Sequence, residues 1–195
     1  MPVIFDDEKR MNIRNSLLKN GFELIKKYGM RKTSVEEIAK SCGIAKGTFY
    51  NFFKSKEEFV FEIIQNKRNK AKEYFKSLVD KNGYMDKKEV RQYLEYMVNP
   101  DNNLYLYLTA EDLAVLHARL PKGIIPKDEE VKATTTLLMK CIKDISPSCD
   151  WRVLANYLKI IALASINKDK IIEEALPANI SGILDLTMQE IFGKE

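Results

Sequence analysis

The chain has 195 residues, of which 45% are hydrophobic and 31% are charged, with only eight glycines and six prolines. This composition is typical of a soluble, packed, helix-rich protein and excludes a disordered chain. The net charge is +4, but residues 1–72 carry 16 Lys and Arg against 9 Asp and Glu, a net of +7, and residues 73–195 carry a net of −3. This excess of positive charge indicates a polyanionic partner for the amino-terminal third, unless it is only a solvated basic surface.

Apolar residues at helical spacing predict a first helix over residues 8–28, which Gly29 ends. Ser34 is placed to open a second, short helix, because Glu37 stands at the matching position of a capping box. Gly43 follows that helix and is suited to a left-handed turn. The sequence therefore predicts one long and one short helix before residue 43.

A third short helix is predicted over residues 45–52, and Ser55 and Glu58 repeat the capping-box spacing at the start of a fourth helix over 56–80. The stretch LYLYL at 104–108 alternates like a strand, but a single strand would leave its backbone unpaired, so we expect helix there. The predicted fold class is all-α. Five further helices are predicted over residues 86–98, 104–120, 129–145, 151–166 and 177–192.

The third helix divides its side chains between two faces, because successive residues of a helix turn by about 100°. Phe49 and Phe53 can anchor the helix to its neighbours, whereas Tyr50 faces outward. Gly47 leaves a gap through which phosphates and base edges can be approached closely. Two short helices around a glycine-containing turn predict a helix-turn-helix; a helical hairpin with a solvated face is the alternative. The hydrogen-bonding groups around the gap belong to Lys46, Thr48, Tyr50 and Asn51.

The segment TSVEEIAKSCGIAKGTFYNFFKSKEEF, residues 33–59, resembles the DNA-binding signature of TetR-type transcriptional regulators, and the resemblance covers roughly residues 10–60. Two positions depart from the family's pattern: Cys42 replaces the usual alanine, and Phe52 replaces a commonly polar residue that often contacts phosphate. The residues that carry the resemblance are Thr33, Val35, Ile38, Ala39, Gly43, Ile44, Lys46, Gly47, Thr48, Phe49, Tyr50, Phe53, Lys56, Glu57 and Glu58.

The resemblance implies a three-helix, helix-turn-helix DNA-binding domain at residues 1–58 and a helical ligand-binding and dimerisation domain at residues 59–195. It also implies a set of DNA contacts that largely coincides with the outward face described above. Base contacts would come from Ala45, Lys46, Gly47, Thr48 and Tyr50, and phosphate contacts from Thr33, Tyr50, Asn51 and Lys56.

A single short recognition helix reads too few base pairs, so we expect two copies on a twofold axis, about 34–36 Å apart or a multiple of that distance. Apolar stripes on the last two helices are candidates for the dimer contact, although any core helix carries such a stripe. The resemblance supplies their assignment to a four-helix dimer interface. The predicted contacts are Leu154, Leu158, Ile161, Ile183, Leu184 and Thr187.

Tyrosine and methionine are frequent between the DNA-binding segment and these last helices. They indicate either ordinary core or a pocket for an apolar or aromatic effector, in which phenols supply polar contacts. An effector that favours one spacing of the DNA-binding heads would shift the equilibrium away from DNA binding. The predicted pocket residues are Tyr93, Tyr96, Met97, Tyr107 and Met139.

We therefore expect a DNA-binding transcriptional regulator: a homodimeric repressor released from a palindromic operator in double-stranded DNA by a small-molecule effector. A helical ligand-binding or adaptor protein without DNA binding is the alternative, and an activator is also left open. An enzyme is not expected, because the sequence shows no nucleophile–base pair or phosphate-binding glycine loop, and its one histidine, His117, lies in an apolar helical pattern.

No cofactor and no metal are expected, since Cys42, Cys141 and Cys149 form no ligand pair and fit a reducing compartment. The start of the chain has acids where a secretion signal has its apolar segment. The longest apolar run, residues 160–166, is too short to cross a bilayer. These features predict a cytoplasmic protein.

Overall fold

The computed structural model describes residues 7–120 and 128–193 of the chain. These residues form helices joined by turns and irregular segments, with one isolated bridge and no strand among them, so the predicted all-α class is confirmed. The chain forms two compact units: an amino-terminal unit of Met1–Asn66 with Tyr107–Ile124, and a carboxy-terminal unit of Lys67–Leu106 with Ile125–Glu195. The functional division predicted at residue 58 stays a prediction.

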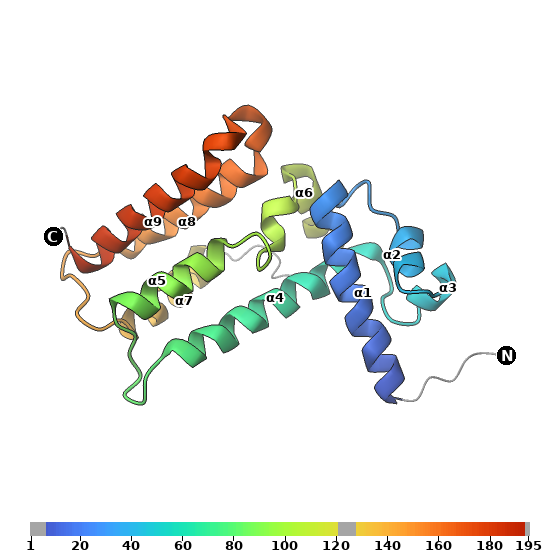
Figure 1. The fold of residues 1–195 in the computed structure, drawn as a ribbon, viewed down its shortest axis with the longest axis horizontal. Coiled ribbons are helices and arrows are strands. Elements are labelled where there is room, and N and C mark those ends of the chain that lie inside the picture. The colour runs from blue at the N-terminus through green and yellow to red at the C-terminus, as the bar shows by residue number, and fades with distance from the viewer. Residues whose placement is uncertain (1–6, 121–127, 194–195) are drawn as a thin grey trace. The chain divides into compact units, whose positions relative to one another are not determined.

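The first segment of the amino-terminal unit holds α1 (Asp7–Tyr28), α2 (Val35–Ser41) and the start of α4 (Lys56–Leu78) (Figure 1). The capping box predicted for α2 is present. The Ser34 hydroxyl accepts the N–H of Glu37 at 3.1 Å, and the Glu37 carboxylate accepts the N–H of Ser34 at 2.8 Å. The start of α2 therefore follows from local hydrogen bonding.

The third helix is shorter than the predicted 45–52, because α3 spans only Lys46–Phe49. After it, the N–H of Asn51 binds the carbonyl of Thr48 at 3.1 Å, and the N–H of Phe52 binds the carbonyl of Phe49 at 2.9 Å. These bonds between residues i and i+3 form a tighter turn than the α-helix does. Phe53, which follows the turn, is 1% exposed.

Three aromatic rings form the centre of the amino-terminal unit. Phe49, Phe53 and Phe59 are buried, and their ring centroids lie 4.9 to 5.3 Å from one another. The ring of Phe59 also reaches α1, where a Cβ atom on Gly21 would lie 2.2 Å from its Cζ atom. Glycine at position 21 therefore lets α1 and α4 pack closely.

The second segment of the amino-terminal unit carries α6 (Ala110–Arg119). The helix predicted over 104–120 is instead two elements, because Thr109 has extended backbone and caps α6. Its hydroxyl accepts the N–H of Asp112 at 3.1 Å. The alternating stretch before it forms a 3₁₀ helix, η1 (Leu104–Tyr107).

Side chains join α6 and its neighbouring residues to the first segment of the same unit. Arg31 pairs with Glu111 at 2.6 Å, and Arg119 pairs with Glu57 at 2.8 Å. The ring of Tyr107 packs edge-on against Phe22, with the centroids 6.2 Å apart. Segments about fifty to ninety residues apart in the sequence thus build one unit.

The carboxy-terminal unit contains the rest of α4, α5 (Lys87–Val98), α7 (Asp128–Lys140), α8 (Trp151–Ile166) and α9 (Leu176–Phe192). The helices α8 and α9 run antiparallel side by side, and α5 packs along α9 (Figure 1). Two short 3₁₀ helices, η2 (Lys168–Lys170) and η3 (Glu173–Ala175), connect α8 to α9.

The helix α7 ends at Lys140 rather than at the predicted residue 145. The residues after it pair with the start of α5 instead: the N–H of Met85 binds the carbonyl of Cys141 at 2.7 Å, and the N–H of Lys143 binds the carbonyl of Met85 at 2.9 Å. The core of this unit is mainly aliphatic. Its buried side chains are Met85, Val90, Leu94, Ile142, Leu154, Ile161, Leu184, Met188 and Ile191.

Candidate nucleic-acid interface

One face of α3 and the turn after it is exposed, and we call this face the recognition surface. Phe49 on the opposite side is 0% exposed, whereas Tyr50 is 47% exposed. Thr48 is half-buried, and a Cβ atom on Gly47 would meet no atom within 4 Å. Six of the eight predicted DNA-contact residues are therefore exposed or half-buried on or next to α3. The recognition surface consists of Ala45, Lys46, Gly47, Thr48, Tyr50 and Asn51.

Aromatic packing fixes the orientation of this surface. The ring of Tyr50 lies edge-on against Phe49, with the centroids 5.5 Å apart and the planes at 86°. Because Phe49 is anchored against Phe53 and Phe59, the Tyr50 ring is held at the surface. The strand-like local preference of TFYNFF is thus overridden by tertiary packing.

Arg10 lies beside the recognition surface, and no sequence pattern singled it out. Its Nη2 atom donates to the carbonyl of Asn51 at 3.1 Å, and its Cζ atom lies 5.2 Å from the centroid of the Phe52 ring. Arg14, one turn further along α1, lies 5.4 Å from the centroid of the Phe53 ring and pairs with Glu62. The start of α1 therefore supports the end of the recognition surface.

Two predicted DNA contacts lie apart from the recognition surface. Thr33 is 1% exposed, and its hydroxyl donates to the carbonyl of Gly29 at 2.9 Å, so this hydroxyl is not at the surface. Lys56, the first residue of α4, is half-buried. Burial lowers the pKa of its ammonium group, while the charges of Glu57 and Asp112 act in the opposite direction.

The predicted effector-pocket residues are divided between the two units. Tyr107 belongs to the amino-terminal unit. In the carboxy-terminal unit, Tyr96 stacks on Tyr74 with the centroids 4.4 Å apart, and Tyr93 meets Phe75 edge-on at 5.3 Å. Met139 packs against the aliphatic core, and Met97 is half-buried. Tyr93, Tyr96 and Met139 therefore pack against neighbouring side chains, and their role in an effector pocket stays a prediction.

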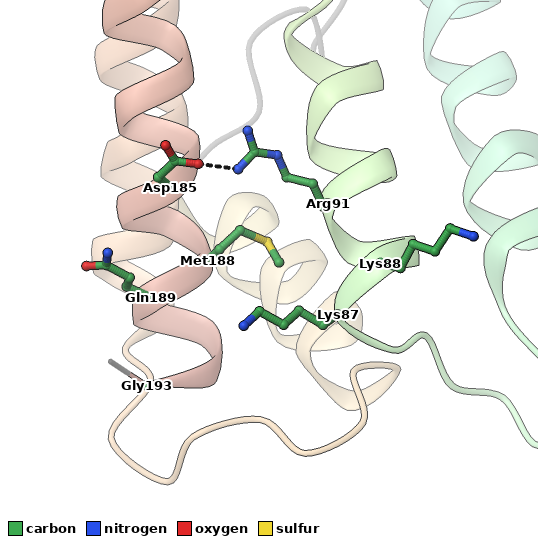
Figure 2. Close-up of a pocket in the computed structure, with 7 residues that line it drawn as sticks. All are labelled: Lys87, Lys88, Arg91, Asp185, Met188, Gln189 and Gly193. Atoms are coloured by element: carbon green, nitrogen blue, oxygen red, sulfur yellow. Dashed lines mark hydrogen bonds and ion pairs between the residues drawn. The ribbon is translucent and has the colours of Figure 1, made fainter. Parts of the chain in front are cut away.

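A groove of about 810 Å³ lies instead between α5 and α9 (Figure 2). Arg91 reaches across it to Asp185, as Figure 2 shows, and also binds Glu95 at 2.7 Å. Two carboxylates therefore compensate the charge of Arg91. The predicted effector residues are not among its lining residues, which are Lys87, Lys88, Arg91, Asp185, Met188, Gln189 and Gly193.

The residues predicted to form a dimer interface pack within one chain, and their role in a dimer contact stays a prediction. They lie on α8 and α9, which pack against each other, and most of them contribute to the core of this unit. An apolar stripe fits an internal contact and a contact between subunits equally well. Leu154, Ile161, Leu184 and Thr187 are buried, and Leu158 and Ile183 are half-buried.

Exposed apolar side chains lie on other faces of the same two helices. Ile160 and Leu163 on α8 are 47% and 60% exposed, and Leu186 on α9 is 47% exposed. Over residues 7–120 and 128–193, no helix is long and apolar enough to cross a membrane. No group of three His, Cys, Asp or Glu side chains in these ranges could hold a metal ion.

Comparisons with known proteins agree with this geometry. A family model described as bacterial regulatory proteins, tetR family, matches residues 17–63, which include α2, α3 and the turn between them. The chain is 30% identical over 124 residues to the uncharacterized HTH-type transcriptional regulator YerO of Bacillus subtilis, covering 61% of this chain and 39% of YerO. It is 38% identical over 53 residues to the HTH-type transcriptional repressor KstR2 of Mycolicibacterium smegmatis, covering 27% of this chain and 26% of KstR2.

The chain thus matches less than half the length of either curated relative. Among solved structures, it resembles the fatty acid degradation regulator FadR from Bacillus halodurans, with a TM-score of 0.59 and 18% identity over 90% of this chain and 94% of that one. This likeness shows a shared all-helical fold. These proteins are named as regulators, and none is named as an enzyme. Residues 17–63 therefore form a segment of the TetR-family type, and the curated relatives matched over part of the chain are named as transcriptional regulators.

Proposed function

We propose that this chain binds operator DNA as a homodimer in the cytoplasm and represses transcription until a small-molecule effector releases it. The observation that carries the proposal is the recognition surface, where polar and cationic side chains are exposed around Gly47 while the aromatic rings beside them are buried. A helix can approach base edges closely only where its side chains are small.

The proposed contacts follow the exposure of each residue. Lys46 and Thr48 flank Gly47 and are assigned to base edges, together with Ala45. Tyr50, Asn51 and Lys56 are assigned to phosphates, which form much of any protein–DNA contact. A phosphate contact by Thr33 would require its hydroxyl to leave the Gly29 carbonyl, so Thr33 is the weakest member of the set.

The proposed dimer contact uses the outer faces of α8 and α9. Leu163 and Ile160 lie one turn apart on α8, and Leu186 lies on α9. Gly182 on α9 is exposed, and a Cβ atom there would meet nothing within 4 Å, so a second helix could approach closely at this point. Two copies would present two recognition surfaces to a palindromic operator.

Repression enters the proposal from KstR2, which is named as a transcriptional repressor. Release by an effector enters it from the family resemblance of residues 33–59. The effector site is proposed for the carboxy-terminal unit, around Tyr93, Tyr96, Met97 and Met139. Tyr107 is left out, because it packs on Phe22 in the other unit. An effector would have to open the packing among these side chains.

Selection of duplexes from a random DNA library, followed by binding titrations at several salt concentrations, tests the proposal. The wild-type protein should select a palindrome and lose affinity steeply as salt rises. Lys46→Ala should weaken binding by about 1–3 kcal/mol, and Tyr50→Phe by about 0.5–1.5 kcal/mol.

Two matched variants control for general charge and for tyrosine chemistry. Lys76→Ala removes an exposed lysine from the carboxy-terminal part of α4. Tyr84→Phe changes a tyrosine that is 47% exposed, as Tyr50 is. Both should bind the selected duplex as the wild type does. If no duplex is enriched, the proposal fails, and a helical ligand-binding or adaptor protein becomes the better description.

A further inference from the structure

We infer that the DNA-binding surface extends from α3 onto the first half of α1 through Arg10, which supplies a phosphate contact of its own. This inference rests on the proposed DNA binding. It concerns a residue that lies outside the segment matched by the family model, which begins at residue 17.

The place of Arg10 is set by two contacts to the end of the recognition surface. Its guanidinium donates to the carbonyl of Asn51 at 3.1 Å and lies over the Phe52 ring, 5.2 Å from the centroid. Arg10 is exposed and Phe52 is half-buried, so the guanidinium is at the surface and the ring lies partly beneath it. The group is therefore held beside Asn51 and Phe52, and it has less freedom than a long side chain without such contacts.

The charge and donor count of Arg10 suit a phosphate. Phe52 has no hydrogen-bonding group, so it interrupts the polar surface after Asn51. The guanidinium over its ring has five N–H donors, and within the described residues the structure records only one of them as engaged, in the bond to Asn51. The planar fork of the remaining donors matches the oxygens of a phosphate.

Arg14 has the same relation to Phe53 but a different chemical situation. Its guanidinium pairs with the carboxylate of Glu62, so its charge is compensated within the unit. Arg10 has no recorded carboxylate partner among residues 7–120 and 128–193. The two arginines therefore have different roles. Arg14 joins α1 to α4, and Arg10, free of a carboxylate partner among the residues that the structure describes, can contact a DNA phosphate.

The experiment compares Arg10→Gln, Arg10→Lys and Lys19→Gln with the wild type on a selected duplex and on an unrelated duplex of equal length. Lys19 is exposed and nine residues from Arg10, about 180° around the same helix, so Lys19→Gln makes the same charge change on the opposite face. Thermal unfolding of each variant checks that the fold is kept.

A phosphate contact predicts that Arg10→Gln makes the slope of log K against log salt less steep by about 0.9 and lowers affinity about eightfold at 0.1 M salt, on both duplexes. Arg10→Lys should keep the slope, and Lys19→Gln should change neither quantity. Weaker binding with an unchanged slope in Arg10→Gln would show that Arg10 only positions Asn51 and Phe52, and would overturn the inference. A wild-type protein that binds neither duplex would overturn the proposed function as well.

Discussion

The two units of the molecule build their cores differently and leave different groups exposed. The amino-terminal unit packs Phe49, Phe53 and Phe59 around a four-residue helix and exposes lysine, tyrosine and amide groups beside them. The carboxy-terminal unit packs aliphatic side chains between helices of ordinary length and exposes Leu163 and Leu186. Polar and cationic groups suit a polyanion, whereas exposed apolar groups suit another protein surface. These two sets of exposed groups therefore support the partners proposed for the two units, DNA for the first and a second copy of the chain for the second.

The largest effect is expected from Phe59→Ala, which empties the aromatic core and should lower the free energy of unfolding by about 3–5 kcal/mol. Trp151, the only tryptophan, lies in the carboxy-terminal unit. If the units unfold separately, circular dichroism should show an early transition while Trp151 fluorescence keeps its wild-type midpoint. Coincident shifts of both signals would show instead that the shared helix α4 couples the two units.

A smaller loss is expected from Gly21→Ala. The added Cβ atom would lie 2.2 Å from the Cζ atom of Phe59, and overpacking of this kind costs about 1–3 kcal/mol. The gain in helix propensity offsets at most about 1 kcal/mol of this cost. Urea denaturation measures the difference, and a stability equal to or above the wild type would mean that the Phe59 ring moves aside freely.

Gly47→Ala separates an effect on stability from an effect on DNA affinity. A Cβ atom at position 47 meets nothing within 4 Å, so the variant should be as stable as the wild type or more stable by up to about 1 kcal/mol. Its affinity for the selected duplex should nevertheless fall, by about tenfold, because the helix can no longer approach the bases as closely. Unchanged affinity would show that DNA does not approach the helix closely at Gly47.

The smallest change in subunit stability is expected from Leu163→Glu, within about 0.5 kcal/mol, because the side chain is 60% exposed. The same substitution should convert a dimer into a monomer in analytical ultracentrifugation, since it places a charge in the proposed contact. Leu137→Glu is the control: Leu137 is 62% exposed on α7 and should leave the dimer intact. A dimeric Leu163→Glu protein would move the contact to another face.

Local signals in the sequence were sufficient to predict several helices. The apolar spacing of α1 and α8 predicts both ends of these helices within a residue or so. The Ser34–Glu37 capping box predicts the start of α2. The outward side of α3 could also be predicted from the sequence. A glycine and polar residues among aromatic residues leave few ways to bury the rings.

Features that depend on contacts between distant residues could not be predicted from the sequence. The turn after α3 replaces its predicted last residues so that Phe53 reaches the core, and Thr109 divides a segment that looked like one helix. Arg10 meets Asn51 across 41 residues of sequence, which no local pattern reveals. The stripe around Leu184 fits an internal partner as well as a second subunit, so only three-dimensional packing could assign it.

The path of the backbone has a consequence for dividing this chain into fragments. The polypeptide leaves the amino-terminal unit after Asn66 and re-enters it for Tyr107–Ile124. A fragment cut at Asn66 would lack α6 and with it the partners of Arg31 and Glu57. A chimaera that joins the amino-terminal unit to the carboxy-terminal unit of another protein must therefore carry both segments. A single crossover point in the gene cannot exchange this unit as a whole.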